Sequence, residues 1–442
     1  MASRLALTSV RSGSSESVGW RAGGVGVPQP SRLLIAAFVA FVASLPFEEG
    51  LVLGSEELVS VSRLLGYAFF VLALLQPRVC FRRPPGAIWW FAIYIVFYAV
   101  GGLFQPSPLL PKIYATAFRF SQLFVVLWVG YNLLRHEQVA RSCLWGFGWA
   151  CVAVAGLLVL GGSSYKGASS GRQTVFGQGV DSIAAVLALG AVVLIGMVYG
   201  KGGAHRITKL VVWGGFFVVA VAIARTGTRG AVVELGAGLM ALLASRGSTR
   251  TRIRNAIIVV LALLVCYGVT MLSASTAGRW QSTLEEGNMS GRQRIYPAAW
   301  KMVEERPLLG WGPGTNYYEL GYRLRLPIRD THNLFLRLLT ELGLAGTIPF
   351  CIGLVLCVRA AWRGRESTQG LLPLALIVAS LTVNLSNTYL ELKWFWVVLA
   401  YSLASETYLQ VKRRRWSAQP SNRLEAFSRP GTARGHVVQR PA

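Results

Sequence analysis

The chain has 442 residues, of which 53% are hydrophobic and only 14% are charged. Soluble globular proteins carry about 25% charged residues, so this composition excludes an ordinary soluble domain. The formal net charge of +25 is typical of nucleic-acid-binding proteins. No nucleic-acid-binding motif accompanies the charge, however, and we expect no nucleic-acid partner.

The two ends of the chain differ from its middle. Residues 1–31 are rich in Ser, Gly and Arg and lack the apolar stretch of a signal peptide, so we expect a disordered cytoplasmic tail. Residues 412–442 are basic and polar, and we expect a second disordered cytoplasmic tail, drawn to the anionic headgroups of membrane lipids. The transmembrane domain is predicted between them, at residues 32–411.

Apolar runs of about 18–25 residues, long enough to cross a bilayer as helices, recur along this middle part. They lie near residues 32–47, 58–76, 87–104, 113–134, 142–161, 175–199, 207–224, 228–245, 253–273, 332–358, 370–387 and 392–411. The sequence therefore predicts an all-α, polytopic integral membrane protein with about twelve transmembrane helices.

Positive residues gather in every second connection between these runs. The groups are Arg78, Arg82 and Arg83; Arg135 and Arg141; Lys201, Arg206 and Lys209; Arg246, Arg250, Arg252 and Arg254; Arg359, Arg363 and Arg365; and Lys412 to Arg415. Short basic loops stay in the cytoplasm, so we expect both termini there. The connection that carries Glu48, Glu49, Glu56 and Glu57 then faces outward.

The longest connection, at about 274–331 between the ninth and tenth spans, is predicted on the outer side. Its middle predicts a helix from Arg292 to Glu305, which the Arg306-Pro307 pair should end. The apolar face of that helix comprises Ile295, Ala299 and Met302 or Val303. The connection is large enough to cover a cavity at the membrane surface but small for an independent domain.

A tight turn and a helix start follow in this connection. The turn reads P-L-L-G-W-G-P-G, where Gly310, Gly312 and Gly314 supply backbone freedom. We expect Thr331 to cap the tenth span, whose apolar run starts at Leu334.

His332 is the one histidine on the predicted outer side. The other three, which fall on the cytoplasmic side, are His136, His205 and His436. Neutral imidazole near its working pH is a suitable base for an attacking hydroxyl, and a helix N-terminus and nearby arginines disfavour its charged form. Asp330 could orient the ring or act as the base itself. Asn333 lies at the same helix start, and packing or capping is the alternative role for His332.

Outward arginines accompany this histidine. Guanidinium groups bind phosphate oxygens with two parallel hydrogen bonds, and departure of a diphosphate needs charge stabilisation more than protonation. Arg229 is predicted at the outer N-terminus of the eighth span, where the helix dipole also favours an anion, and Arg225 lies four residues earlier. Of Arg292 and Arg294, which point in different directions on a helix, we favour Arg292.

Other charged and aromatic residues are interpreted more simply. We expect headgroup or loop charges at Lys112, Lys166, Arg172, Arg323, Arg325 and Arg329. Arg119, inside the fourth span, has either a functional role or a structural partner. Arg337 and Glu341 are four apart and suit a pair within the tenth span. Trp300 and Trp311 suit either sugar stacking or the membrane interface.

Metal and thiol chemistry find little support in the sequence. The outward carboxylates are adjacent pairs that point apart, and none neighbours His332, so we expect no metal and no cofactor. The six cysteines show no ligand spacing, and we interpret them as small buried hydrophobic residues.

Four stretches in order carry a resemblance to a known family. They are T-G-T-R-G at 226–230, G-R-x-x-x-Y-x-x-A-W at 291–300, P-L-L-G-W-G-P-G at 307–314 and H-N-L-F-L-R-L-L-T-E-L-G-L-A-G at 332–346. Their order, with the outward loop, resembles the O-antigen ligase and O-antigen polymerase superfamily from about residue 220 to 350. The rest of the chain fits only by its apolar spans.

The resemblance implies an inverting, metal-independent glycosyltransferase at the outer face of the plasma membrane. Its donor would be a glycan on undecaprenyl diphosphate. By position in the motifs, the catalytic histidine of the family corresponds to His332, and the diphosphate-binding arginines correspond to Arg229 and Arg292.

The sequence does not distinguish between the classes of hydroxyl that could be the acceptor. A ligase uses a lipid A-core acceptor, a polymerase extends a growing glycan, and relatives glycosylate protein hydroxyls; we lean slightly to a ligase in lipopolysaccharide and surface polysaccharide biosynthesis. A transporter of an anionic solute is the rival from another class, although the two halves of the chain show no matching broken helices. A non-catalytic scaffold for envelope assembly would not need His332.

Overall fold

The computed structural model describes residues 29–417, with gaps. The gaps are 49–59, 165–171, 200–204, 245–248, 273–276, 279, 283–284, 286 and 288. Outside the described residues lie most of the predicted N-terminal tail and residues 418–442 of the C-terminal tail. The same holds for Glu49, Glu56, Glu57, Lys166, Lys201, Arg246 and His436.

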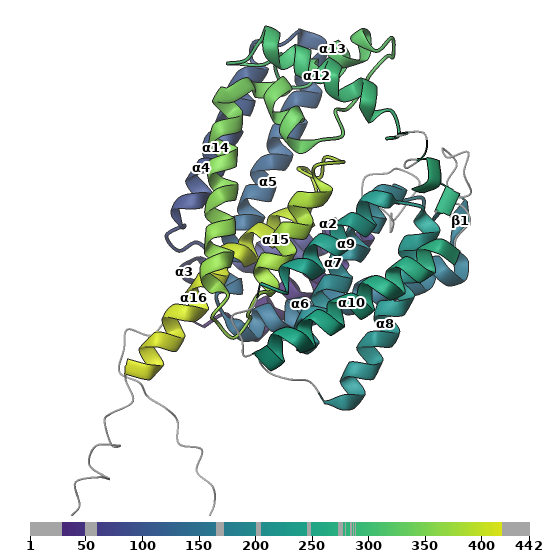
Figure 1. The fold of residues 1–442 in the computed structure, drawn as a ribbon. Helices are drawn as coiled ribbons and strands as arrows, with labels where there is room; N and C mark the ends of the chain where they lie inside the picture. Colours follow the sequence, from purple (N-terminus) through teal and green to yellow (C-terminus); the bar gives the residue numbers. More distant parts are fainter. Residues whose placement is uncertain are drawn as a thin grey trace, which may run out of the picture.

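The described part is helical except for one short ribbon, in which β1 (Ser163–Ser164) pairs antiparallel with β2 (Gln173–Thr174) (Figure 1). Each predicted apolar run contains one helix. These helices are α1 (Arg32–Ser44), α2 (Val61–Leu74), α4 (Gly86–Gly102), α5 (Leu110–Leu134), α6 (Glu137–Gly161), α7 (Val180–Tyr199), α8 (Arg206–Thr226), α9 (Arg229–Ala241), α10 (Thr249–Leu272), α14 (Leu334–Gly364), α15 (Leu372–Val383) and α16 (Lys393–Ser417). Short turns are α3 (Pro77–Cys80), η1 (Leu45–Phe47) and η2 (Ser107–Leu109). Helix α16 continues six residues past the predicted start of the tail at 412.

Six helices in the described residues are long and apolar enough to cross a membrane: η2 with α5, then α6, α7, α8, α10 and α14. Four more, which are α1 with η1, α2, α4 and α15, are apolar but shorter. The protein is therefore an all-helical integral membrane protein. The number of twelve spans and the outward orientation of the 274–331 connection stay predictions.

Helix α7 lies at the centre of one group of helices and contacts α6, α8, α9 and α15. Its apolar residues face all directions, and nearly all of them are buried, as expected for a helix enclosed by others. A second group is formed by α4, α5, α14 and α16, where aromatic rings of Phe91, Tyr94 and Phe350 pack edge to face. Helix α15 contacts both groups and joins them.

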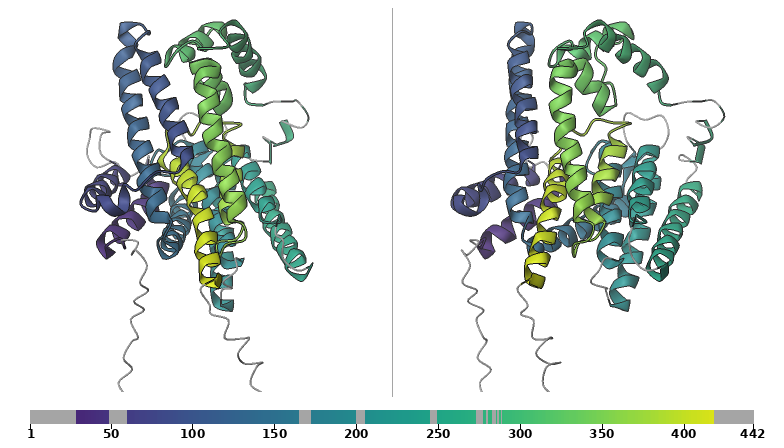
Figure 2. Two further views of the ribbon diagram at one scale, coloured as in Figure 1. Left: turned by 90° about the vertical axis from the view of Figure 1, so that its left-hand side faces the viewer. Right: turned by 60° about the vertical axis from the view of Figure 1, so that its left-hand side comes forward.

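The predicted helix in the long connection is confirmed, because α12 spans Arg292–Glu305 and buries Ile295, Ala299, Met302 and Val303. A second helix, α13 (Thr315–Arg323), was not predicted. Its sequence mixes tyrosines with polar residues between glycine-rich turns, so it shows no long apolar period. Helices α12 and α13 contact the upper part of α14, and the upper ends of α4 and α5 lie beside them (Figure 2).

The glycine turn and the start of α14 complete each other's backbone hydrogen bonds. Gly343 has φ 59° and ψ −157°, which interrupts α14. The freed amides of Leu344 and Ala345 donate to the carbonyls of Pro307 and Leu308 at 2.8 and 3.0 Å. In return, the amides of Trp311 and Gly312 donate to the carbonyls of Thr340 and Glu341 at 2.8 and 2.9 Å. The three predicted turn glycines all have positive φ, at 66°, 93° and 76°.

Candidate functional site

His332 lies two residues before α14, in a left-handed backbone conformation with φ 49° that non-glycine residues rarely adopt. The cap of α14 is Asn333, whose side chain accepts from the amide of Leu336 at 3.1 Å. The expectation that Thr331 caps this helix is wrong: its buried hydroxyl donates to the carbonyl of Asn333 at 3.0 Å. The left-handed step at His332 lets the chain turn into the helix at Asn333 instead.

The connection between α15 and α16, residues 384–392, forms one wall of the site. Its carbonyls at Asn384 and Leu385 accept from the amide of Leu334 and the side chain of Asn333, at 2.9 and 3.0 Å. The hydroxyl of Tyr296, from α12, lies 2.9 Å from the Leu385 carbonyl and 3.3 Å from that of His332. Sequence patterns marked this connection only as a short break between two spans.

Arg229 and Arg292 meet at the same wall. Arg292, the first residue of α12, donates through Nε to the carbonyl of Ser386 at 3.1 Å. Arg229, the first residue of α9, donates to the hydroxyl of Ser290 at 2.7 Å. Any Cβ at Gly230 would lie 3.0 Å from the hydroxyl of Ser386, so the start of α9 approaches the wall closely. The two guanidinium groups lie within electrostatic range of each other.

Arg172 was predicted to be a loop or headgroup charge, but its hydrogen bonds stabilise the start of α9. It donates to Asp181 at 2.6 Å, to the hydroxyl of Thr228 at 2.8 Å and to the carbonyl of Thr226 at 2.8 Å. Its charge also acts on Arg229, and the charge of Asp181 acts on His332. The expectation for Arg172 is therefore wrong, because this residue ties the α7 and α9 starts together beside the site.

Arg329 is a second charge that the sequence analysis placed in the loop. Its guanidinium lies 3.9 Å from the position of a Cβ at Gly291, beside Arg292, and its charge acts on His332. Neither Arg172 nor Arg329 stands in a recognisable motif. The signal that could have found Arg329 is its spacing of three residues from His332.

The other two candidate arginines lie differently. Arg225 donates to the carbonyl of Val159 at 2.6 Å and reaches Gln173 at 3.5 Å, so it fastens the end of α8 to the end of α6. Arg294 is exposed on α12, whereas Arg292 is partly buried against Ser386. Arg292 thus lies within electrostatic range of both His332 and Arg229, whereas Arg225 is bonded to the end of α6 and Arg294 is exposed.

The surroundings of His332 favour a neutral imidazole. Burial lowers the pKa of His332, and the charges of Arg329 and Arg292 lower it further, while Asp330 acts in the opposite direction. Nδ1 of the ring lies 3.9 Å from Oδ2 of Asp330, which is close enough for charge interaction but too long for a hydrogen bond. At neutral pH the ring can therefore accept a proton.

Ion pairs hold the end of the 384–392 connection that precedes α16. Glu391 accepts from Arg337 at 2.7 Å and from Arg119 at 2.8 Å, which supplies the structural partner for Arg119. Arg337 also lies 3.6 Å from Glu341, one turn further along α14, as the predicted pair requires. Arg337 and Glu341 are buried, so this network holds the 384–392 connection against α14.

The two tryptophans near the site, Trp311 and Trp300, have different surroundings. Trp311 donates to the carbonyl of Met302 at 3.0 Å, and the guanidinium groups of Arg306 and Arg323 lie 4.1 and 5.1 Å from its ring centre. Trp311 is thus a packing residue, and Trp300 is exposed.

Among the described residues, no three His, Cys, Asp or Glu side chains are grouped to hold a metal ion. Metal independence stays a prediction.

Residues 214–351 match a family model described as O-antigen ligase. The matched region contains Arg229, Arg292 and His332, but not Arg172 or the 384–392 connection, which join the site only through the fold. A comparison with curated proteins finds no match.

Proposed function

Because residues 214–351 make this chain a member of the O-antigen ligase superfamily, we propose that it is an inverting glycosyltransferase. Its donor is a glycan on undecaprenyl diphosphate, and its acceptor is a hydroxyl group in surface polysaccharide assembly. Transfer takes place at the outer face of the plasma membrane. The observation that supports this proposal most strongly is the position of Arg292, which contacts the 384–392 wall and lies within electrostatic range of both His332 and Arg229.

The reaction needs one base and a site for a departing diphosphate. His332 takes the proton from the acceptor hydroxyl, whose oxygen attacks the anomeric carbon from the face opposite the diphosphate. The bond from that carbon to the phosphate oxygen breaks, and its electron pair leaves with the diphosphate. Attack from the opposite face inverts the anomeric configuration.

The departing anion is stabilised by charges that are already in place. Arg229 and Arg292 bind the diphosphate oxygens, and the amides at the start of α9 add a favourable helix dipole. Thr228, at the cap position of α9, makes no side-chain capping hydrogen bond among the described residues. Arg172 adds positive charge beside Arg229, whereas burial and the charge of Arg329 favour the neutral form of His332. These residues can balance the charge of a departing diphosphate by themselves, which supports a metal-independent reaction.

The description of the matched family favours a ligase, and the amount and length of surface glycan in cells would distinguish the acceptor classes. A ligase moves the finished glycan to lipid A-core, and we favour this reaction over chain polymerisation and protein glycosylation. Loss of attached glycan with normal chain length indicates a ligase, whereas shortened chains indicate a polymerase.

The test replaces His332 with alanine in cells that lack the native copy, at matched expression. Removing a general base lowers the rate by about 10²–10⁴-fold, so surface glycan should fall to background. His205, just before α8, provides the matched control, because His205→Ala removes an imidazole far from Arg292 in sequence and should leave surface glycan unchanged. Normal glycan attachment by His332→Ala would refute the catalytic role.

A further inference from the structure

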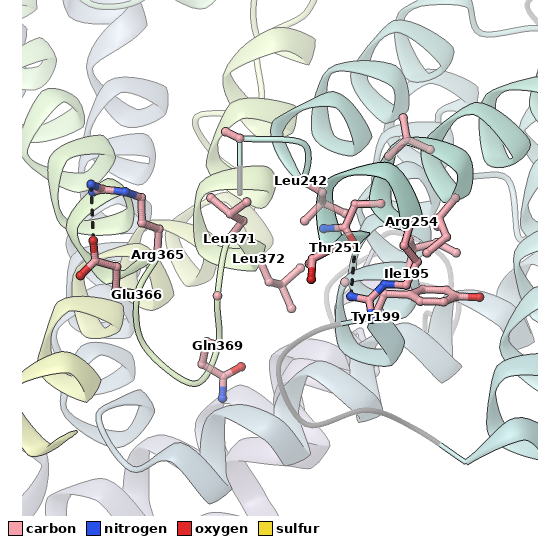
Figure 3. Close-up of a pocket in the computed structure, with 16 residues that line it drawn as sticks. Ile195, Tyr199, Leu242, Thr251, Arg254, Arg365, Glu366, Gln369, Leu371 and Leu372 are labelled. Atoms are coloured by element: carbon pink, nitrogen blue, oxygen red, sulfur yellow. Dashed lines mark hydrogen bonds and ion pairs between the residues drawn. The ribbon is translucent and has the colours of Figure 1, made fainter. Parts of the chain in front are cut away.

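A cavity of about 410 Å³ lies at the end of α14 away from His332. It is bounded by the last residues of α7 and α9, the first turns of α10, and the connection from α14 to α15 (Figure 3). Helix α14 begins beside His332 and ends at Gly364, and its part beyond Gly343 alone spans about 30 Å. The cavity is therefore separate from the glycan-transfer site.

One side of this cavity is aliphatic. The side chains that form it are Ile195, Leu242, Ile258, Val259, Leu371 and Leu372. Ile195 comes from α7, and Ile258 and Val259 come from α10, two helices that are long and apolar enough to cross a membrane. Such a wall suits an alkyl chain rather than a sugar or a nucleotide.

The polar residues that line the cavity include two arginines. Figure 3 shows Arg254 and Arg365 on opposite sides, with Gln369 between them. Arg254 donates to the uncharged side chain of Asn255 at 3.3 Å. Arg365 donates to the carbonyl of Trp362 at 2.6 Å, and its guanidinium lies 4.3 Å from the centre of the Trp362 ring. Its charged neighbour Glu366 lies 3.7 Å away and is half exposed, so this pair neutralises the charge of Arg365 only weakly.

We propose that this cavity binds an anionic phospholipid, with its phosphate at the arginine-bearing rim and an acyl chain along the aliphatic wall. Basic pockets between transmembrane helices are known to suit such headgroups. The volume falls within the range of small-molecule sites and takes a headgroup with the upper part of one chain. The bound lipid would hold the starts of α10 and α15 together, because each contributes to the cavity.

The test uses the full chain, purified in detergent and stripped of lipid, and native mass spectrometry counts bound lipid. The probes are phosphatidylglycerol and phosphatidylcholine with identical acyl chains, and glycerol 3-phosphate, which has the anion but no chain. We expect at least fivefold tighter binding of phosphatidylglycerol than of phosphatidylcholine, and no competition by glycerol 3-phosphate.

Variants separate the two parts of the site. Arg254→Gln and Arg365→Gln should each weaken phosphatidylglycerol binding about fivefold and leave phosphatidylcholine binding unchanged. Arg252→Gln is the matched control, because Arg252 is exposed on the same helix outside the cavity. Leu242→Trp fills the aliphatic side and should weaken both lipids.

Three results would overturn the proposal: equal binding of the two lipids, displacement by glycerol 3-phosphate, or an equal loss in Arg252→Gln. The first two come from the unmodified protein, so they hold even where a variant fails to fold. Glycan transfer is not a readout in this test, and its outcome is independent of the proposed function.

Discussion

The backbone of His332 has a strained conformation that neighbouring residues hold in place. Its left-handed φ of 49° is strained for a residue with a Cβ, and such strain persists only where neighbours enforce it. The neighbours are Tyr296, which lies against its carbonyl, and the Leu334 amide, which is bonded to Asn384. The backbone at His332 is thus held between α12 and the wall formed by residues 384–392.

The charges around His332 predict the pH dependence of transfer. A lowered pKa keeps the imidazole neutral, so the rate should fall only at pH values below the usual imidazole pKa of about 6.5. Because Arg329 lowers the pKa, Arg329→Gln should move this acidic limb to higher pH. Asp330 raises the pKa, so Asp330→Asn should move the limb to lower pH. Rate profiles of kcat/KM between pH 5 and 8 measure both shifts, and shifts in the same direction would contradict this assignment.

Arg292 and Arg294 form a natural pair of test and control. Lysine keeps the charge of Arg292 but loses the two-pronged contact, which is worth about 1.5–3 kcal/mol. Arg292→Lys should therefore lower kcat/KM for the lipid-linked donor about 10–100-fold, measured with purified protein. Arg294→Lys, on an exposed position of the same helix, should stay within about twofold. Equal losses in the two variants would remove Arg292 from the site.

At the residue scale, motifs and spacing selected His332, Arg229 and Arg292 as candidates because each stands in a recognisable pattern at a helix start. Arg172 could not be selected in this way, since its partners Thr226 and Thr228 are distant in the sequence. Ser386 contributes only a backbone carbonyl to Arg292, and no side-chain pattern marks a carbonyl.

The glycine turn at 307–312 and the interruption of α14 at Gly343 are distant in sequence but are joined by backbone hydrogen bonds. The interruption of α14 at Gly343 frees backbone groups that the turn at 307–312 then binds. The sequence predicted the turn glycines, since closely spaced Gly and Pro have few other roles. It did not predict the break at Gly343, because the surrounding apolar run continues without a change in period.

The contact between the glycine turn and α14 leaves no room for a side chain at Gly343. An added Cβ would collide with the backbone of Leu308, and the positive φ alone costs about 1–3 kcal/mol for alanine. Gly343→Ala should therefore lower the yield of folded protein strongly, as measured by fluorescence-detected size-exclusion chromatography. Gly268→Ala is the control: a Cβ at Gly268 in α10 meets no atom within 4 Å, and its yield should be unchanged.

For the whole molecule, composition and apolar runs predicted the helical fold and placed one helix in each run. They could not fix how many of these helices cross the bilayer. Helices α9 and α15 have 13 and 12 residues, which is shorter than the apolar runs predicted at 228–245 and 370–387. Hydropathy alone therefore overestimates their length.

The predicted orientation has a direct consequence at this scale. Lys301, exposed on α12, should face outward, and Arg252, exposed at the start of α10, should face the cytoplasm. In intact spheroplasts, a membrane-impermeant maleimide should label Lys301→Cys but label Arg252→Cys only after lysis. The unmodified chain, with its six cysteines, sets the background. Labelling of Arg252→Cys alone before lysis would invert the topology.

The most direct test of the site measures donor binding and glycan transfer separately in the purified protein with an undecaprenyl diphosphate-linked glycan. We predict that His332→Ala binds the donor as the unmodified protein does but transfers at least 100-fold more slowly. Arg292→Lys should lose donor affinity as well. Full transfer by His332→Ala, with unaltered donor binding, would contradict the assignment of His332 as the base.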